Sequence, residues 1–141
     1  MSRIYWDTML FIYLLEDHPE FAPRVRQLLE RSYKRRDALC TSYLALGEVL
    51  AGAEKSPQPE KTMAVRQTLQ EMGFSYLPFD GGAVGVFSRL RARERLRVAD
   101  SIHLACAASA GIDLFLTGDQ QLIRLDIPGI QFVANFNTPV L

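Results

Sequence analysis

Four acidic side chains could converge on a single substrate, and they belong to Asp7, Glu48, Asp100 and Asp119. The first follows an apolar run at residues 4–6, and the last closely follows another at residues 114–117. The other two stand in segments with a helical pattern. Carboxylates gathered in one cleft repel one another, and a bound divalent cation removes that conflict. Because every ligand would be an oxygen atom, the pattern favours a Mg²⁺ or Mn²⁺ site.

Short apolar runs alternate with helical segments, and together they would position these acids. We expect strands at residues 4–6, 38–41, 74–78, 114–117 and 130–133. Helical patterns cover residues 10–15, 21–29, 44–50, 60–72, 84–90 and 101–110. Such alternation predicts an α/β fold with a mainly parallel sheet of about five strands and helices on both faces. Right-handed crossovers then place the carboxyl ends of the strands, where ligands bind, along one edge.

Local signals mark several helix boundaries, which we expect at Ser42, Gly73, Asp80 and Gly111. The helix with the third acid is expected to start at Asp100 and to cover residues 101–110. Asp100 could therefore be only an N-cap, and Asp119 could be only a turn residue. Glu48 lies on an otherwise apolar helix face, where a carboxylate requires a partner because its desolvation is costly.

The composition indicates a single globular domain over residues 1–141. Hydrophobic residues make up 48% of the chain and charged residues 23%, as in proteins with a packed core. Lys and Arg number 16, as do Asp and Glu, which argues against a globally basic nucleic-acid binder but allows a local basic patch. We find no signal-peptide pattern and no apolar run near the ~20 residues of a membrane span. Cys40 and Cys106 lack metal-site spacing, so we expect two buried thiols in a cytoplasmic protein.

The residues around the four acids form motifs that resemble one known family. The segment YWDT at residues 5–8 resembles its opening strand and first acid. The segments TSYLALGEV at residues 41–49, ADSIHLA at residues 99–105 and FLTGD at residues 115–119 resemble its later motifs. In this order, and over nearly the whole chain, they resemble the PIN-domain family and within it the VapC-type toxins of bacterial toxin–antitoxin pairs.

This resemblance implies a metal-dependent endoribonuclease with a three-layer α/β/α PIN-like fold, acting as the toxin of a type II toxin–antitoxin pair. The four acids would be catalytic and would hold Mg²⁺ or Mn²⁺, with Glu48 acting on the metal directly or through its bound water. Thr8 and Thr117 would orient carboxylates or water with their hydroxyls. Hydrolysis of RNA requires an activated water and neutralised phosphate charge, and a bound metal supplies both.

Two departures from the family's motifs leave an alternative open. Met9 stands where the first motif usually has Asn, and Gly118 stands where the fourth usually has Asn. Each change removes a hydrogen-bonding side chain near the cleft, and such losses can lower metal affinity or activity about 10–100-fold. The alternative is a PIN fold retained for RNA or protein binding, with weak or no nuclease activity.

Basic residues and one histidine near the third motif have two interpretations each. Arg93, Arg95 and Arg97 could contact RNA phosphates at the rim of the cleft, or they could be solvated charges at a helix end. His103 follows Asp100 by one helical turn and could be a base, but we expect it to be a polar residue in helix packing.

Repulsion among the acids also predicts that at least one of them has a raised pKa in the metal-free protein.

Other α/β classes lack residues that they need. A haloacid-dehalogenase-type phosphatase needs a second Asp at the position of Met9, and a response-regulator receiver needs a further early acid and a late Lys. A dinucleotide-binding module needs G-x-G-x-x-G after the first strand.

As partners the resemblance implies RNA, a cognate antitoxin and a second copy of the chain. An antitoxin segment carrying Arg would suit the acids, and apolar residues within 21–29 or 60–72 are candidates for the dimer contact.

Overall fold

The chain folds around one parallel β-sheet, and the computed structural model describes residues 1–141. The sheet has five strands in the order β3-β2-β1-β4-β5. The strands are β1 (Arg3–Trp6), β2 (Ala38–Ser42), β3 (Ser75–Leu77), β4 (Ile112–Thr117) and β5 (Ile130–Asn135). Every pairing is parallel, so all five carboxyl ends lie along one edge, as the alternating pattern predicts.

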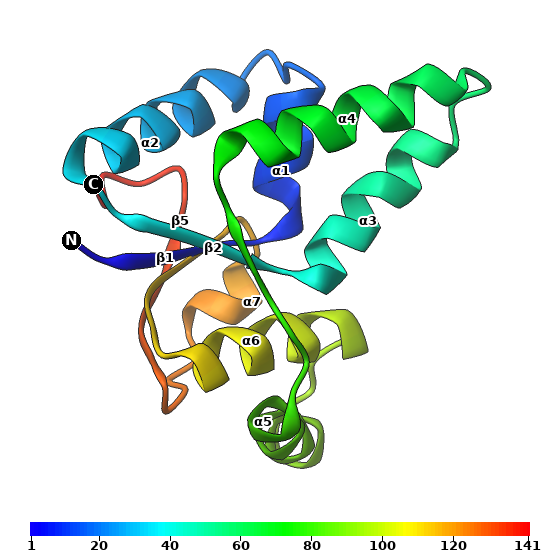
Figure 1. The fold of residues 1–141 in the computed structure, drawn as a ribbon. Helices are drawn as coiled ribbons and strands as arrows, with labels where there is room; N and C mark the ends of the chain where they lie inside the picture. The colour runs from blue at the N-terminus through cyan, green and yellow to red at the C-terminus, as the bar shows by residue number, and fades with distance from the viewer.

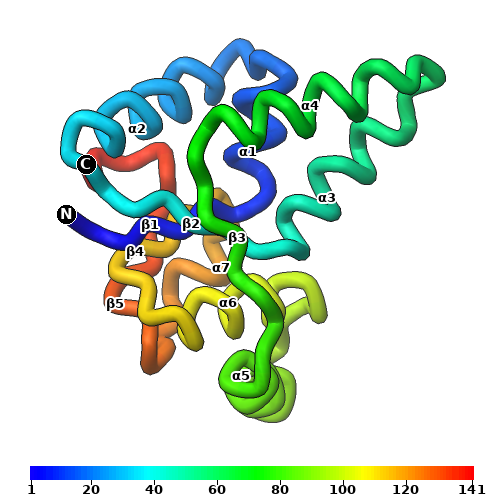
Figure 2. Tube along the Cα trace, viewed as in Figure 1, coloured from blue at the N-terminus to red at the C-terminus, as the bar shows by residue number.

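Helices cover both faces of the sheet and complete a three-layer α/β/α fold, which confirms the expected fold class (Figure 1). One layer consists of α1 (Thr8–Leu15), α2 (Ala22–Arg35), α3 (Tyr43–Glu54) and α4 (Pro59–Met72). The other layer consists of α5 (Gly81–Arg93), α6 (Val98–Ala110) and α7 (Gln120–Ile123). The antiparallel pair α3 and α4 extends away from the sheet as a helical hairpin (Figure 2).

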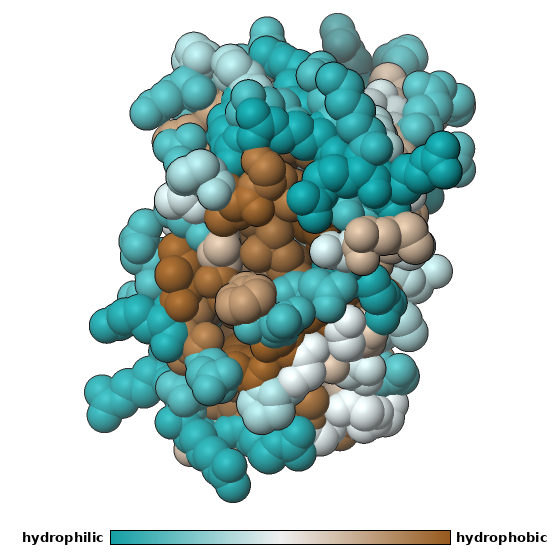
Figure 3. Space-filling model, turned by 90° about the vertical axis from the view of Figure 1, so that its left-hand side faces the viewer, coloured by the Kyte–Doolittle hydropathy of each residue, from teal (hydrophilic) through white to brown (hydrophobic).

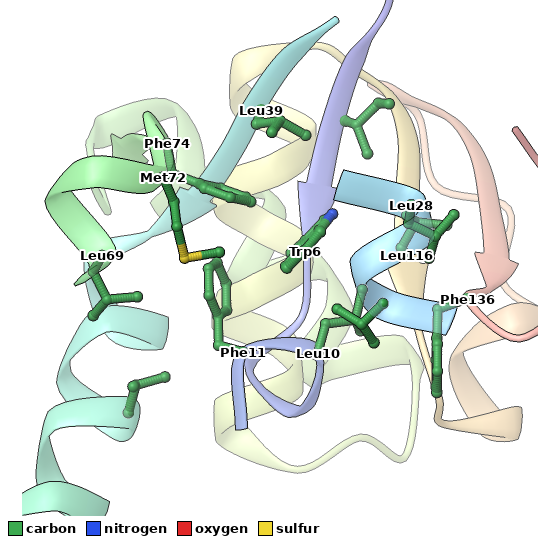
Figure 4. Packing of buried hydrophobic residues seen from close by; sticks show 13 residues of the cluster. Trp6, Leu10, Phe11, Leu28, Leu39, Leu69, Met72, Phe74, Leu116 and Phe136 are labelled. Atoms are coloured by element: carbon green, nitrogen blue, oxygen red, sulfur yellow. The ribbon is translucent and has the colours of Figure 1, made fainter. Parts of the chain in front are cut away.

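Side-chain alternation along the strands divides the core into two clusters. Trp6 is fully buried on the α1–α4 side, where its ring lies 5.1 Å from that of Phe11 and 4.9 Å from that of Phe74 (Figure 4). Tyr5, the preceding residue, is fully buried on the α5–α7 side and stacks on Phe115. Burial of each large side chain contributes roughly 1.5–3 kcal/mol. The central strand β1 is therefore fixed from both faces, directly before the first acid.

Most of the expected helix boundaries are confirmed. The side chains of Ser42 and Asp80 accept N–H groups of the first turns of α3 and α5, at 3.1 and 2.9 Å. Gly73 and Gly111 end α4 and α6 with φ angles of 77° and 72°, in the left-handed region that glycine adopts without a Cβ penalty.

The predicted start of α6 is wrong. The helix begins at Val98 with Arg97 at its N-cap, so Asp100 lies inside the first turn and is not the capping residue. The helix dipole favours an acid in the first turn, and Asp is also a preferred N-cap residue. The sequence therefore does not distinguish the two positions. The short helix α7 was not expected, and the side chain of Asp119 caps it.

Both segments expected for the dimer contact remain candidates. Along 21–29, Val25 and Leu28 are fully buried in the core, whereas Phe21 and Leu29 are only partly buried. On α4, Met63 is 73% exposed.

Cys40 and Cys106 are buried as expected, and desolvation raises the pKa of Cys106 to about 11. None of the helices has the length and hydrophobicity of a membrane-spanning segment.

Candidate active site

A cavity of about 490 Å³ opens at the carboxyl edge of the sheet, and all four predicted acids line it. Asp7 follows β1, and Asp119 follows the neighbouring strand β4 after one glycine. Glu48 projects from α3, and Asp100 from the first turn of α6. Residues far apart in the sequence meet here because parallel strands return the chain to the same edge after each crossover.

Asp7 is the most firmly held of the acids. It is 9% exposed, and each of its carboxylate oxygens accepts a hydrogen bond. Oδ1 accepts the backbone N–H of Thr8 at 2.8 Å, and Oδ2 accepts the hydroxyl of Thr117 at 2.7 Å. The Thr117 hydroxyl also accepts the backbone N–H of Asp119 at 3.1 Å. Thr117 therefore connects the first acid with the segment that carries the last.

Glu48 is held through one oxygen. Its Oε1 accepts the Thr8 hydroxyl at 2.7 Å and lies 2.8 Å from Nε2 of His103, whereas Oε2 has no hydrogen-bond partner within the chain. The hydrogen bond from His103, opposed by partial burial and reinforced by Thr8, lowers the pKa of Glu48 below its ordinary value. Glu48 is therefore not the acid with a raised pKa that repulsion among carboxylates predicts.

His103 is a site residue that sequence reasoning did not place in the cavity. It is 2% exposed on α6, as expected for helix packing, but it also lines the cavity and contacts Glu48. Its Nδ1 lies 2.7 Å from the Tyr5 hydroxyl, and its Nε2 lies 3.2 Å from the Thr8 hydroxyl. Its spacing of three residues from Asp100, which was noted from the sequence, puts both side chains on one helix face. The expected role was packing alone.

Asp100 is 6% exposed and forms an ion pair with Arg97, whose Nε lies 3.0 Å from Oδ2. The pair raises the pKa of Arg97. Because the Arg97 side chain is 80% exposed, the pair adds only about 0–1 kcal/mol to stability. A small free energy is thus enough to separate Arg97 from Asp100 when another cation competes for the carboxylate.

The donor set fits a hard divalent cation in its chemistry. The cavity offers carboxylate oxygens from four residues, and Oε2 of Glu48 and Oδ2 of Asp119 accept no hydrogen bond within the chain. Oxygen ligands of this kind suit Mg²⁺ and Mn²⁺. As the side chains stand, no three of the chain's His, Cys, Asp and Glu residues surround one point closely enough to hold a metal. The carboxylate of Asp100 is paired with Arg97 instead.

The predicted basic residues divide between two neighbouring places. Arg97 lines the acidic cavity, whereas Arg93 and Arg95 line an adjacent hollow of about 480 Å³ at the α5–α6 connection. Arg124, at the end of α7, also lines this hollow and was not identified from the sequence. Glu94 is the only acid in its lining.

Comparisons with known proteins agree with the fold. A family model for the PIN domain matches residues 4–128. The VapBC2 structure of Rickettsia felis, bound to a promoter DNA fragment, is 17% identical with a TM-score of 0.77 and covers 94% of this chain and 98% of that chain. The DNA-bound VapBC structure of Salmonella typhimurium is 25% identical with a TM-score of 0.74 and covers 96% and 99%.

A third similar structure is VapBC-5 of Mycobacterium tuberculosis, described as a member of a toxin–antitoxin family. It is 21% identical with a TM-score of 0.63 and covers 94% of this chain and 98% of that chain. No sequence among the curated proteins matches the chain. The structural likeness extends over nearly the full length of both chains, so it concerns the whole fold together with the edge that carries the acids.

Proposed function

The chain belongs to the PIN-domain family, and from this premise we propose that it is a metal-dependent endoribonuclease, the toxin of a bacterial toxin–antitoxin pair. One observation carries the proposal. Asp7, Glu48, Asp100 and Asp119 line a single cavity at the carboxyl edge of the sheet. Such a cluster has little structural use, because carboxylates gathered at one place, two of them buried, cost free energy that a bound cation would offset.

The catalytic roles follow from how each acid is held. Mg²⁺ or Mn²⁺, when bound, would activate a water and neutralise charge on the scissile phosphate. Asp7, fixed by Thr8 and Thr117, would be the rigid ligand, and Asp100 would join it on release from Arg97. Asp119 would contribute a further ligand. Glu48 stays ionised because its pKa is lowered, so its free Oε2 can bind the cation directly or hold a metal-bound water.

RNA would approach the acids across a basic rim. Arg97 borders the cavity, and Arg93 and Arg95 border the adjacent hollow together with Arg124. The last three arginines are exposed and form no ion pair within the chain, so their charges are available to phosphates. Phosphate contacts of this kind supply affinity that falls as salt rises.

A cognate antitoxin is the proposed protein partner, because the similar structures are VapBC complexes and one belongs to a toxin–antitoxin family. A groove of about 300 Å³ between α1, α3 and α4 supports this part of the proposal. Its lining is mostly apolar, and Ile12 borders both this groove and the acidic cavity. An antitoxin segment could therefore fill the groove and extend an Arg side chain toward the acids.

A homodimer is the proposed assembly. Figure 3 shows apolar side chains gathered on the side of the molecule where both chain ends lie, with polar residues around them. On the edge strand β5, Phe132 is 63% exposed. Contiguous apolar surface of this kind is typical of protein interfaces. Phe132 is therefore a further candidate for the dimer contact, beside the segments 21–29 and 60–72.

RNA cleavage tests the proposed function. The purified protein is expected to cut structured RNAs, including tRNA and ribosomal stem-loops, in the presence of Mg²⁺ or Mn²⁺, with cleavage lost on chelation. Asp7→Asn should lower the rate by roughly 100-fold or more, because it removes charge stabilisation at the reacting centre. Asp126→Asn is the matched control, since this exposed acid lies outside the cavity. Cleavage that survives both Asp7→Asn and chelation would contradict the proposal.

The alternative is a PIN fold that binds RNA or protein with weak or no nuclease activity. Met9 and Gly118, which replace the usual Asn residues, both line the cavity and favour this reading. The same RNA panel separates the two functions when binding is measured beside cleavage. Tight RNA binding with no Mn²⁺-dependent cleavage would establish the alternative.

A further inference from the structure

The hydrogen bonds of Glu48 show how a flexible acid is held at the cavity. A glutamate side chain has several rotatable bonds, and ordering it costs conformational entropy. Glu48 is nevertheless anchored at Oε1 by Thr8 and His103, at 2.7 and 2.8 Å, while Oε2 is left without a partner in the chain. The anchored oxygen determines where the free oxygen can bind a ligand.

The proton on His103 determines whether this anchor works. An ionised carboxylate can only accept hydrogen bonds, so Nε2 of His103 must carry a hydrogen to bond with Glu48. The other ring nitrogen, Nδ1, lies 2.7 Å from the hydroxyl of Tyr5. The bond made by one ring nitrogen selects which nitrogen is protonated. A Tyr5 hydroxyl that donates to Nδ1 thus selects the ring form that donates from Nε2 to Glu48.

We propose that Tyr5 and His103 form a positioning relay that holds Glu48 ready for a divalent cation. Tyr5 is fully buried in the central strand and stacks on Phe115, with ring centroids 4.7 Å apart and planes 7° from parallel. The Ser42 hydroxyl lies 2.8 Å from the phenol oxygen. In the relay Ser42 donates to that oxygen, because the single hydroxyl hydrogen of Tyr5 is directed at Nδ1 of His103. The relay therefore ties the position of Glu48 on α3 to the buried central strand β1.

This inference rests on the proposed function, and it goes beyond it by giving roles to two residues that would not touch the metal or the RNA. The competing explanation is purely structural. In that case His103 would fill buried volume and satisfy the Tyr5 hydroxyl, and its contact with Glu48 would have no effect on the cavity. The two explanations assign the essential contact to opposite ends of the imidazole ring.

Two substitutions of His103 separate these explanations. The amide of His103→Gln can replace Nε2 and reach Glu48, but it leaves Tyr5 without its partner. The shorter amide of His103→Asn can replace Nδ1 and reach Tyr5, but it falls short of Glu48. Tyr5→Phe removes the hydroxyl alone and keeps the ring that stacks on Phe115. Tyr33→Phe is the matched control, because the Tyr33 hydroxyl bonds to the carbonyl of Met72 outside the cavity.

Calorimetric titration with Mn²⁺ measures the effect without using cleavage as the readout. We expect His103→Asn to weaken Mn²⁺ binding by about 10–100-fold, His103→Gln to recover most of the loss, and Tyr33→Phe to bind as the wild type does. Tyr5→Phe should also weaken binding, although its hydroxyl lies two hydrogen bonds from the Glu48 carboxylate. Circular dichroism and melting curves confirm that each variant is folded.

Two results would overturn the relay. One is Mn²⁺ binding by His103→Asn as tight as by His103→Gln, and the other is unchanged binding by a folded Tyr5→Phe. Tyr5→Phe preserves all apolar packing, so it keeps the test decisive even where a substitution of His103 prevents folding. A wild-type protein that binds no Mn²⁺ would overturn the proposed metal-dependent function and the relay with it.

Discussion

At the scale of single residues, the acids of the cavity differ in how they are held rather than in what they are. Asp7 has both oxygens occupied, Asp100 is paired with Arg97, and Glu48 keeps one oxygen free. The same chemical group is therefore fixed in Asp7, can exchange its partner in Asp100, and keeps one oxygen available for a ligand in Glu48. These differences arise from neighbouring side chains, above all from Thr8 and His103, which both bond to the same oxygen of Glu48.

The lowered pKa of Glu48 predicts a change in acid stability. A group whose folded pKa lies below its unfolded value, about 4.3 for Glu, stabilises the fold above that value and loses this contribution as pH falls through the folded pKa. Glu48→Gln removes the titrating group. Melting temperatures of the metal-free proteins between about pH 6 and pH 3 should therefore fall less steeply for Glu48→Gln than for the wild type.

Glu71→Gln is the control for this measurement, because Glu71 is exposed on α4 and lies outside the cavity. Its melting profile should follow that of the wild type. Equal slopes for the wild type and Glu48→Gln across this acid range would show that the contacts with His103 and Thr8 do not favour ionised Glu48.

At the scale of secondary-structure elements, the turn after β4 explains one departure from the family's motifs. A Cβ atom on Gly118 would lie 3.2 Å from Cε1 of Phe136, which is 3% exposed just after β5. The ring thus occupies space that a side chain at residue 118 would need. The absence of the usual Asn at residue 118 therefore goes together with the position of the Phe136 ring at the end of the sheet.

This packing predicts the outcome of restoring the amide. Gly118→Asn should lower the free energy of unfolding by about 1 kcal/mol, the low end of the cost of overpacking, because only its Cβ atom is close to Phe136 and residue 118 is exposed. In a Phe136→Leu background the same substitution should cost less, because the ring that it meets is gone. Denaturant titration of the two single variants and the double variant gives the coupling.

Gly52→Asn supplies the matched control, since a Cβ atom at Gly52 would meet nothing within 4 Å. It should change stability little. If Gly118→Asn proves as mild as Gly52→Asn, the Phe136 ring moves aside freely, and packing does not explain the glycine at residue 118.

At the scale of the whole molecule, the four acids come from different strands and helices that meet at the cavity. Their mutual repulsion therefore acts against the folded state as a whole. A cation that binds only the native protein stabilises all of it, by about 2.7 kcal/mol at a concentration one hundred times its dissociation constant. For a chain of this size, that corresponds to an increase of roughly 5–10 °C in melting temperature. Millimolar Mn²⁺ should produce such an increase.

Asp100→Asn should reduce this increase, whereas Asp126→Asn, outside the cavity, should leave it unchanged. The comparison uses melting curves of each protein with and without Mn²⁺. A wild-type melting temperature that does not move at millimolar Mn²⁺ would count against the metal site and in favour of the fold as a binding module.

The sequence alone was sufficient for the fold class, the four acids around the cavity, and the order of the strands and of every helix except α7. Apolar runs and helical periodicity are local properties, and the motifs around Asp7 and Asp119 keep their spacing within single segments. The start of α6 was misplaced because an acid suits both a helix N-cap and the first helical turn. Periodicity showed that one face of α2 is apolar, but it could not show that the core covers Val25 and Leu28 on that face.

Only the tertiary structure decided which side chains meet. Tyr5, Glu48 and His103 come from a strand and two helices on opposite sides of the sheet, and no local pattern records their hydrogen bonds. The same holds for the contact of Gly118 with Phe136 and for the hollow that Arg124 and Arg93 both line. Long-range packing sets these pairs, because the crossovers and the strand order determine which distant segments share an edge.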